Sequence, residues 1–459
     1  MGKVRLLLLA IALHCASITH AATTLSACKL PGITRAAKCG TVEVPENWDQ
    51  PEGRKLSIAV AVIPAEVGGS HNDPLVPLMG GPSESAISAA EYNFGQAGSL
   101  MRDRDMLLVD QRGSGKSAGL RCQLFDPKNP GASLRDVFPV VGLERCVKEL
   151  SKRADLTQYT YTNFARDLEY VRRALGYGQL NLSGGSYGTR AAQFYLRVYP
   201  QNVRTVLLNS VVPLDIISSL TMAKSAEGAR NQMFDACAAD AACKTAFPDL
   251  RKEFSAIVQQ LDAGQAPIAR GRAAEWLRSK LYRPYSSADV PWMIHRAHEG
   301  DWSPIAKNIE AGAAGAASEY SFGLFFAITC NDDIAFLQED DIARETKGTF
   351  LGDYRVRQQQ AACRFFPRVS PSTDRTPPKV SVPTLFVSGG NDSASPLWFT
   401  QRVAPNFSER AEVVVAGHGH TEWNDCIARL YEQLVNDASV RNVRGKTCAA
   451  VPRPPFKTK

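Results

Sequence analysis

The pattern of hydrophobic positions changes twice along the chain. Up to about residue 213, short apolar runs alternate with amphipathic stretches. Helical stretches rich in alanine and charged residues replace this pattern until about residue 380, and short apolar runs then resume. Short apolar runs are typical of buried strands, whereas a 3.6-residue spacing is typical of helices. The pattern therefore predicts an α/β fold with a large helical insertion.

Strands are predicted where short stretches are continuously apolar or alternate between apolar and polar residues. The predicted strands are 41–44, 56–62, 74–79, 106–110, 180–182, 203–208, 384–388 and 412–415. The turn at 49–53 predicts an antiparallel hairpin of the first two strands at a sheet edge. Helices are predicted over 164–175, where apolar residues share one face, and over 189–198. Strands that alternate with helices favour a mostly parallel central sheet with helices on both faces.

These changes divide the chain into four parts. The predicted parts are a signal peptide (1–21), the first part of the core (22–213), a mainly helical lid or cap (214–380) and the C-terminal part of the core (381–459). Helical stretches within the lid are predicted at 223–239, 250–261 and 291–299.

The N-terminus has the organisation of a secretory signal peptide. Lys3 and Arg5 precede a short apolar run, and small residues suit cleavage between Ala21 and Ala22. The apolar run is too short to span a membrane, and no later run reaches about 18 residues. We therefore expect a secreted or periplasmic protein without stable membrane insertion.

Composition adds information mainly through the cysteines. The formal net charge is +7 over 459 residues, and the basic residues form no stripe, so we expect no nucleic-acid partner. We expect the protein to be a monomer. Of 11 cysteines, all except Cys15 lie beyond the signal peptide. In an exported protein, ten cysteines in neighbouring pairs favour local disulfides. The predicted pairs are Cys28–Cys39, Cys122–Cys146, Cys237–Cys243, Cys330–Cys363 and Cys426–Cys448.

Gly184, Ser186 and Gly188 form a G-x-S-x-G pattern between a predicted strand and a predicted helix. A serine on such a strained turn has its hydroxyl raised above the sheet, where N–H groups at the helix start stabilise an oxyanion. The pattern predicts a nucleophilic serine. From these five residues alone, an ordinary glycine-rich loop is the alternative.

A serine nucleophile needs a base and an orienting carboxylate, and in this fold class both follow the serine in the chain. Asp392, His418 and His420 each follow a predicted strand. We predict a triad of Ser186, Asp392 and His420, because the glycines on either side of His418 allow a tight turn before His420. His418 remains the alternative base.

The oxyanion formed on the substrate needs two N–H donors. We expect one at Tyr187, directly after the nucleophile, and the other at Gly81 in an early Gly-Gly-Pro loop; an ordinary Gly-Pro turn is the alternative. Gly115-Lys116-Ser117 imitates the end of a phosphate-binding loop, but Asp110 stands where that motif needs glycine. His295 and His298 lack a third ligand nearby. The mechanism requires no metal and no cofactor.

Several stretches match one known family. They are Gly80-Gly81-Pro82, Asp110 to Ser117, Asp167-Leu168 with Arg172 to Gly176, Gly184 to Arg190 with Tyr199-Pro200, Asp392 with Pro396, and the C-terminal histidine loop with Cys426. On these residues the chain resembles the secreted tripeptidyl-aminopeptidase-like and proline-iminopeptidase-like serine peptidases of the α/β-hydrolase superfamily. The resemblance is thin over 214–380. The chain departs from the family at Ser83 and at Asn209-Ser210.

The resemblance implies an α/β-hydrolase fold with a C-terminal part like that of the tripeptidyl aminopeptidases. It also implies an exopeptidase that acts near a peptide's free N-terminus through an acyl-enzyme. Acidic residues of the lid would hold the substrate's ammonium group, and Asp332 and Asp333 are the candidates. A carboxylesterase or lipase with the same triad is the alternative, and a non-catalytic binding protein is a more distant one.

Overall fold

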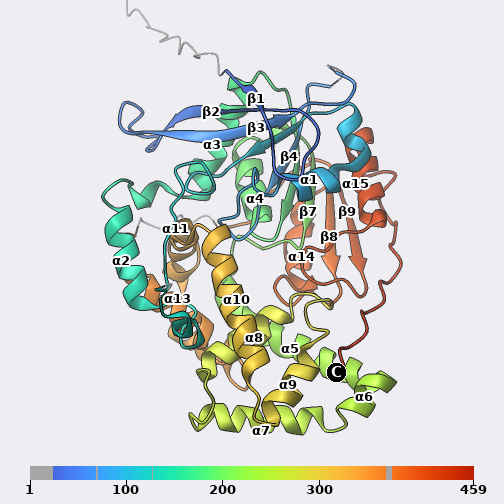
Figure 1. Ribbon diagram of the computed structural model, residues 1–459. Helices are drawn as coiled ribbons and strands as arrows, with labels where there is room; N and C mark the ends of the chain where they lie inside the picture. The colour runs from blue at the N-terminus through green and yellow to red at the C-terminus, as the bar shows by residue number, and fades with distance from the viewer. Residues whose placement is uncertain (1–23, 69–70, 127, 369–374) are drawn as a thin grey trace, which may run out of the picture.

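The computed structural model describes residues 24–68, 71–126, 128–368 and 375–459, so the predicted signal peptide and its cleavage site lie outside the described residues. Nine strands form one sheet in the order β1-β2-β3-β5-β4-β6-β7-β8-β9 (Figure 1). The strands are β1 Ser26–Cys28, β2 Ala37–Pro45, β3 Lys55–Ile63, β4 Leu75–Leu78, β5 Met106–Val109, β6 Leu180–Gly185, β7 Val203–Asn209, β8 Thr384–Gly389 and β9 Arg410–Val415.

The sheet has an antiparallel part and a parallel part. The strands from β5 through β4 and β6 to β9 run parallel, while β1, β2, β3 and β5 pair antiparallel. The predicted hairpin is β2–β3, with Val42 opposite Ile58. One short strand, β1, extends the sheet beyond it, so β2 is not the edge. The predicted mostly parallel sheet is confirmed.

Alternation along the strands divides the sheet's apolar residues between two cores. Leu107 and Val109 of β5 join one cluster, whereas Leu108 joins the other, because successive side chains point to opposite faces. The first cluster includes helices α3, α4 and α14, and the second includes α1 and α15. Their bounds are α1 Ala90–Ala97, α2 Val140–Leu150, α3 Tyr161–Ala174, α4 Gly188–Val198, α14 Leu397–Val403 and α15 Asp425–Asp437.

All helices from α5 to α13 lie in the insertion, which we define as the segment between β7 and β8. Their bounds are α5 Ser218–Ala239, α6 Ala241–Ala246, α7 Leu250–Asp262, α8 Arg270–Lys280, α9 Val290–His298, α10 Ser303–Glu319, α11 Phe322–Asp332, α12 Glu339–Thr346 and α13 Tyr354–Ala362. Most of them gather below the sheet in Figure 1 around an apolar core of their own. Helix α11 instead packs into the sheet's first core, through Leu324 and Phe326 among others.

Five disulfides join the five pairs that the spacing of the cysteines indicates. Cys28–Cys39 fastens β1 to β2, and Cys330–Cys363 joins α11 to the end of α13. None of the described helices is both long enough and apolar enough to cross a membrane. Disulfides of this number fit an exported protein.

Candidate active site

Ser186 lies on the sharp turn between β6 and α4. Its φ is 54°, the left-handed region that is uncommon for a residue with a side chain. Its N–H donates to the Asn209 carbonyl at 3.0 Å, which holds the turn against β7. A methyl group on Gly188 would lie 1.9 Å from the Leu78 carbonyl oxygen, so only glycine allows α4 to start so close to β4.

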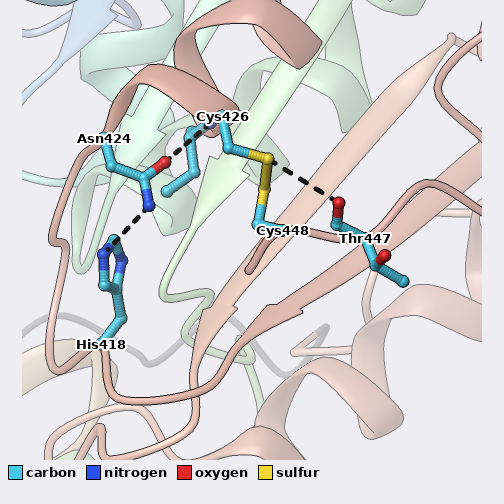
Figure 2. The surroundings of a disulfide bond; sticks show 6 residues. His418, Asn424, Cys426, Thr447 and Cys448 are labelled. Atoms are coloured by element: carbon cyan, nitrogen blue, oxygen red, sulfur yellow. Dashed lines mark hydrogen bonds between the residues drawn. A yellow bond between two sulfur atoms is a disulfide. The ribbon is translucent and has the colours of Figure 1, made fainter. Parts of the chain in front are cut away.

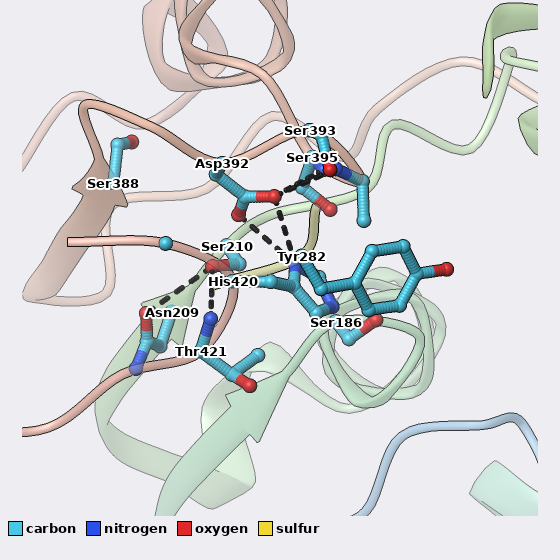
Figure 3. A network of polar contacts seen from close by, with 12 residues as sticks. Ser186, Asn209, Ser210, Tyr282, Ser388, Asp392, Ser393, Ser395, His420 and Thr421 are labelled. Atoms are coloured by element: carbon cyan, nitrogen blue, oxygen red, sulfur yellow. Dashed lines mark hydrogen bonds and ion pairs between the residues drawn. The ribbon is translucent and has the colours of Figure 1, made fainter. Parts of the chain in front are cut away.

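His420 and Asp392 are in direct contact. The His420 Nδ1 atom lies 3.0 and 2.9 Å from the two carboxylate oxygens of Asp392, and both side chains are buried. The backbone N–H groups of Ala394 and Ser395 donate to Asp392 Oδ1 at 2.8 and 2.7 Å. Figure 3 shows the Ser186 side chain beside the imidazole of His420, and the same pocket is lined by both residues.

The insertion supports this pair from the other side. The backbone N–H of His420 donates to the backbone carbonyl of Tyr282 at 2.7 Å. The centroids of the Tyr282 ring and the His420 imidazole are 5.3 Å apart. Arg283 Nε donates to the His420 carbonyl at 2.9 Å. Nothing in the local sequence marks Tyr282 or Arg283 as neighbours of the histidine, and sequence reasoning missed both.

His418, the alternative base, lies elsewhere. Its Nε2 atom is 3.2 Å from Asn424 Nδ2, in the loop that leads to the Cys426–Cys448 disulfide (Figure 2). Burial lowers the pKa of His418, and Glu422 only partly opposes this effect. His418 has no contact with Asp392 of the kind that His420 makes, and it is not among the residues that line the pocket.

The two backbone N–H groups predicted to be oxyanion donors form no hydrogen bond within the described part of the chain. They belong to Tyr187 and Gly81, and both residues line the pocket. Gly81 has a φ of 107°, and a methyl group there would lie 2.5 Å from the Ser83 nitrogen. Gly80 also lies close: a methyl group on it would be 3.3 Å from Ser186 Cβ.

The pocket over Ser186 has a volume of about 550 Å³. Its lining comes from the early glycine loop, the serine turn, the histidine loop and the insertion. Most of the lining is neutral. The acidic and basic side chains there are those of Glu84, Arg283, Arg355 and His420. Sequence reasoning missed Glu84, because the prediction for its loop concerns backbone N–H donors and not side chains.

Asp332 and Asp333, predicted to meet the substrate's ammonium group, are not among the residues that line this pocket. Asp333 is fully buried and pairs with Arg190 of α4 at 2.8 Å, and it accepts a hydrogen bond from the Tyr187 hydroxyl at 2.9 Å. Burial raises the pKa of Asp332 to about 7, against the opposing effect of Arg190. Asp333 therefore joins the insertion to the serine turn.

The other matching motifs build the framework around the pocket. Asp110 accepts hydrogen bonds from the Ser85 hydroxyl at 2.7 Å and from the Ile87 N–H at 3.0 Å, and so holds the glycine loop. The Lys116 N–H also donates to Asp110. Arg112 makes a buried two-point pair with Asp167, with both distances 2.6 Å. The stretch that imitates a phosphate-binding loop thus serves to position Asp110.

The two histidines of α9 lie apart from the pocket over Ser186. His295 Nδ1 lies 3.1 Å from the Glu253 carboxylate, and His298 is exposed. In the described part of the chain, no three His, Cys, Asp or Glu residues are grouped so that they could hold a metal ion.

Comparison with known proteins identifies a family and several relatives. Residues 73–421 match a family described as alpha/beta hydrolase fold. The chain is 28% identical to the serine protease Hip1 of Mycobacterium tuberculosis over 80% of this chain and 78% of that protein. It is 27% identical to the carboxylesterase B of the same organism over 79% of this chain and 76% of that protein. A tripeptidyl aminopeptidase of Streptomyces lividans is 31% identical over a shorter region, 39% of this chain and 36% of that protein.

Proposed function

The chain belongs to the alpha/beta hydrolase fold family, and from this premise we propose that Ser186, His420 and Asp392 are the catalytic triad of a serine hydrolase that releases short N-terminal pieces from peptides. The observation that carries the proposal is the contact between His420 Nδ1 and both carboxylate oxygens of Asp392, 3.0 and 2.9 Å away. This contact fixes a proton on Nδ1, which leaves Nε2 free to act as a base.

In the first half of the reaction, His420 Nε2 takes the proton of the Ser186 hydroxyl while Oγ forms a bond to the carbonyl carbon. The carbonyl oxygen becomes an oxyanion, and the N–H groups of Tyr187 and Gly81 stabilise it. The intermediate collapses as the carbon–nitrogen bond breaks, and His420 gives its proton to the leaving amine. In the second half, water attacks the acyl group in the same way and restores Ser186.

The peptidase proposal draws support from the relatives named serine protease and tripeptidyl aminopeptidase. The relative named carboxylesterase B supports an esterase as the second candidate, since the same triad cleaves esters. We also propose that residues 214–380 act as the lid over Ser186 and that the protein is exported after cleavage near Ala21/Ala22. The five disulfides fit that export.

Labelling with a fluorophosphonate tests the nucleophile, because the reagent bonds to an activated serine. We expect the wild type to be labelled at Ser186 and Ser186→Ala to be unlabelled. A folded wild type without label would refute the catalytic proposal and favour a binding protein. Turnover of peptide arylamides and simple aryl esters then separates the two enzymatic candidates: cleavage of esters alone would favour the carboxylesterase.

A further inference from the structure

Glu84 is the one carboxylate among the described residues that line the pocket over Ser186. It stands on the loop that carries Gly80 and Gly81, and its side chain is half-buried. Neighbouring residues fix this loop, because Asp110 accepts hydrogen bonds from the Ser85 hydroxyl and the Ile87 N–H. The carboxylate therefore belongs to a rigid part of the site.

Glu84 lies close to the reacting serine. A methyl group in place of a hydrogen on Gly80 would lie 3.3 Å from Ser186 Cβ and 3.6 Å from Glu84 Oε2. The two atoms are therefore at most about 7 Å apart, the sum of the two distances. The Glu84 carboxylate therefore faces the same part of the pocket as the reacting serine.

The Glu84 carboxylate is held by one hydroxyl group and forms no ion pair with any described residue, although Arg283 and Arg355 line the same pocket. The Tyr320 hydroxyl donates to Glu84 Oε1 at 3.0 Å, and a methyl group on Gly81 would lie 3.2 Å from Tyr320 Cε1. Tyr320, at the end of α10, thus fixes the carboxylate from the insertion. Across the described ranges, no Lys, Arg or His forms an ion pair with Glu84. A carboxylate in a pocket is stabilised when a cation binds beside it.

We propose that Glu84 binds the substrate's free α-ammonium group and thereby directs the enzyme to release single N-terminal residues. The inference rests on the proposed function, since it assumes acyl transfer to Ser186. Tyr320 is a positioning residue that acts through Glu84.

The length of the released piece follows from chain geometry. In a single aminoacyl group, the ammonium nitrogen lies about 2.5 Å from the carbonyl carbon, so a carboxylate that binds it lies within about 5 Å of that carbon. Each further residue of an extended chain moves the ammonium group about 3.3–3.6 Å away. An extended tripeptidyl group would place it about 7 Å farther from the carbonyl carbon than a single residue does. The position of Glu84 beside Ser186 therefore favours one released residue over three.

The test uses the full-length mature protein and four substrates: alanyl arylamide, trialanyl arylamide and the N-acetylated form of each. We expect the wild type to prefer the free alanyl arylamide in kcat/KM. Glu84→Gln keeps the shape of the side chain but removes its charge. It should lower the ratio of kcat/KM between free and acetylated alanyl arylamide about 10- to 100-fold, the usual effect of losing a charged hydrogen bond.

Two further variants and one control sharpen the result. Tyr320→Phe should lower the same ratio by a smaller factor, because the carboxylate stays but loses its fixed orientation. Glu84→Asp keeps the charge but shortens the side chain, so its ratio of kcat/KM between free and acetylated substrate should lie between those of wild type and Glu84→Gln. If Glu84→Gln does not fold, Glu84→Asp serves as the test variant. Glu52→Gln removes an exposed carboxylate from the β2–β3 turn and should leave the ratio unchanged.

The outcomes separate this inference from the proposed function. Fluorophosphonate labelling of each variant reports whether Ser186 is still activated. If Ser186 is labelled but the wild type prefers the trialanyl substrate, or Glu84→Gln keeps the wild-type ratio, the role of Glu84 is refuted while the hydrolase stands. If Ser186 is unlabelled and neither amides nor esters are cleaved, the proposed function itself fails.

Discussion

The hydrolase core and the insertion contribute to the site in different ways. In the core, Ser186, Asp392 and His420 all follow parallel strands, and the carboxyl ends of such strands meet at one edge of the sheet. In the insertion, the contributing residues act across long separations. The Tyr320 hydroxyl contacts Glu84 across 236 positions, and Arg283 contacts His420 across 137. The comparison teaches that strand order alone brings the core residues together, whereas packing brings in those of the insertion.

The two regions also differ in how they are held together. The insertion has an apolar core of its own, separate from the two cores of the sheet. It is fastened to the serine turn by the buried pair of Arg190 and Asp333, and to the acid and base loops through Leu281 and Tyr282. Changes in the core should therefore act on the chemistry, and changes at these contacts should act on both stability and the site.

The largest effect should come from the base, and it tests the core side of the comparison. His420→Ala removes the proposed acceptor of the serine proton, so we expect kcat to fall on the order of 10⁵- to 10⁶-fold. His418→Ala, two positions away, should change kcat less than about tenfold, because its ring contacts Asn424 rather than Asp392. Equal losses in the two variants would contradict the assignment of the base. Arylamide turnover at a matched concentration of folded protein measures both.

The orienting carboxylate should give the next largest effect. Asp392→Asn keeps the size of the side chain but allows the wrong tautomer of His420, so kcat should fall about 10⁴-fold. The backbone N–H groups of Ala394 and Ser395 now donate to Asp392 Oδ1, and the amide oxygen can still accept them. Fold and KM should therefore change little. A variant with near wild-type kcat would show that His420 needs no carboxylate.

Residues that take part in a strand-end pattern could be predicted from the sequence, and residues placed by packing could not. Ser186, Asp392 and His420 follow recognisable apolar runs in the required order. Asp333 is a candidate for the substrate's ammonium group as an acid of the lid, but its partner Arg190 lies 143 positions away and no local pattern links them. Glu84 could not be predicted because the motif in its loop indicates backbone N–H donors and assigns no role to the side chain that follows.

A smaller effect should follow at the contact between the two regions. Asp333→Asn leaves the buried Arg190 guanidinium without its counter-charge, which typically costs about 3–5 kcal/mol in the free energy of unfolding. Since Asp333 also accepts a hydrogen bond from the hydroxyl of Tyr187, whose N–H we assign to the oxyanion, kcat should fall as well. Urea unfolding and turnover per labelled serine measure the two effects.

Asp167→Asn is the matched control for that variant. Asp167 pairs with Arg112 in an equally buried place, but within the core and away from the pocket lining. We expect a similar loss of stability with little change in turnover per labelled serine. If both variants lowered turnover equally, the proposed link from the insertion to the oxyanion site would be wrong.

The smallest effect concerns the pH dependence of stability that Asp332, the neighbour of Asp333, produces. Burial raises the pKa of Asp332 to about 7, well above its ordinary value of 3.8, so between those values the folded protein binds a proton that the unfolded chain does not. The free energy of unfolding must then decrease as pH rises toward 7, by at most about 1.4 kcal/mol per pH unit, and level off above it. Asp332→Asn has no such proton. Relative to wild type, its stability in urea should rise by up to about 3 kcal/mol between pH 5 and pH 8. Since every other titrating group is common to both proteins, parallel curves would show that Asp332 is ionised throughout and that water reaches its carboxylate more freely than its burial indicates.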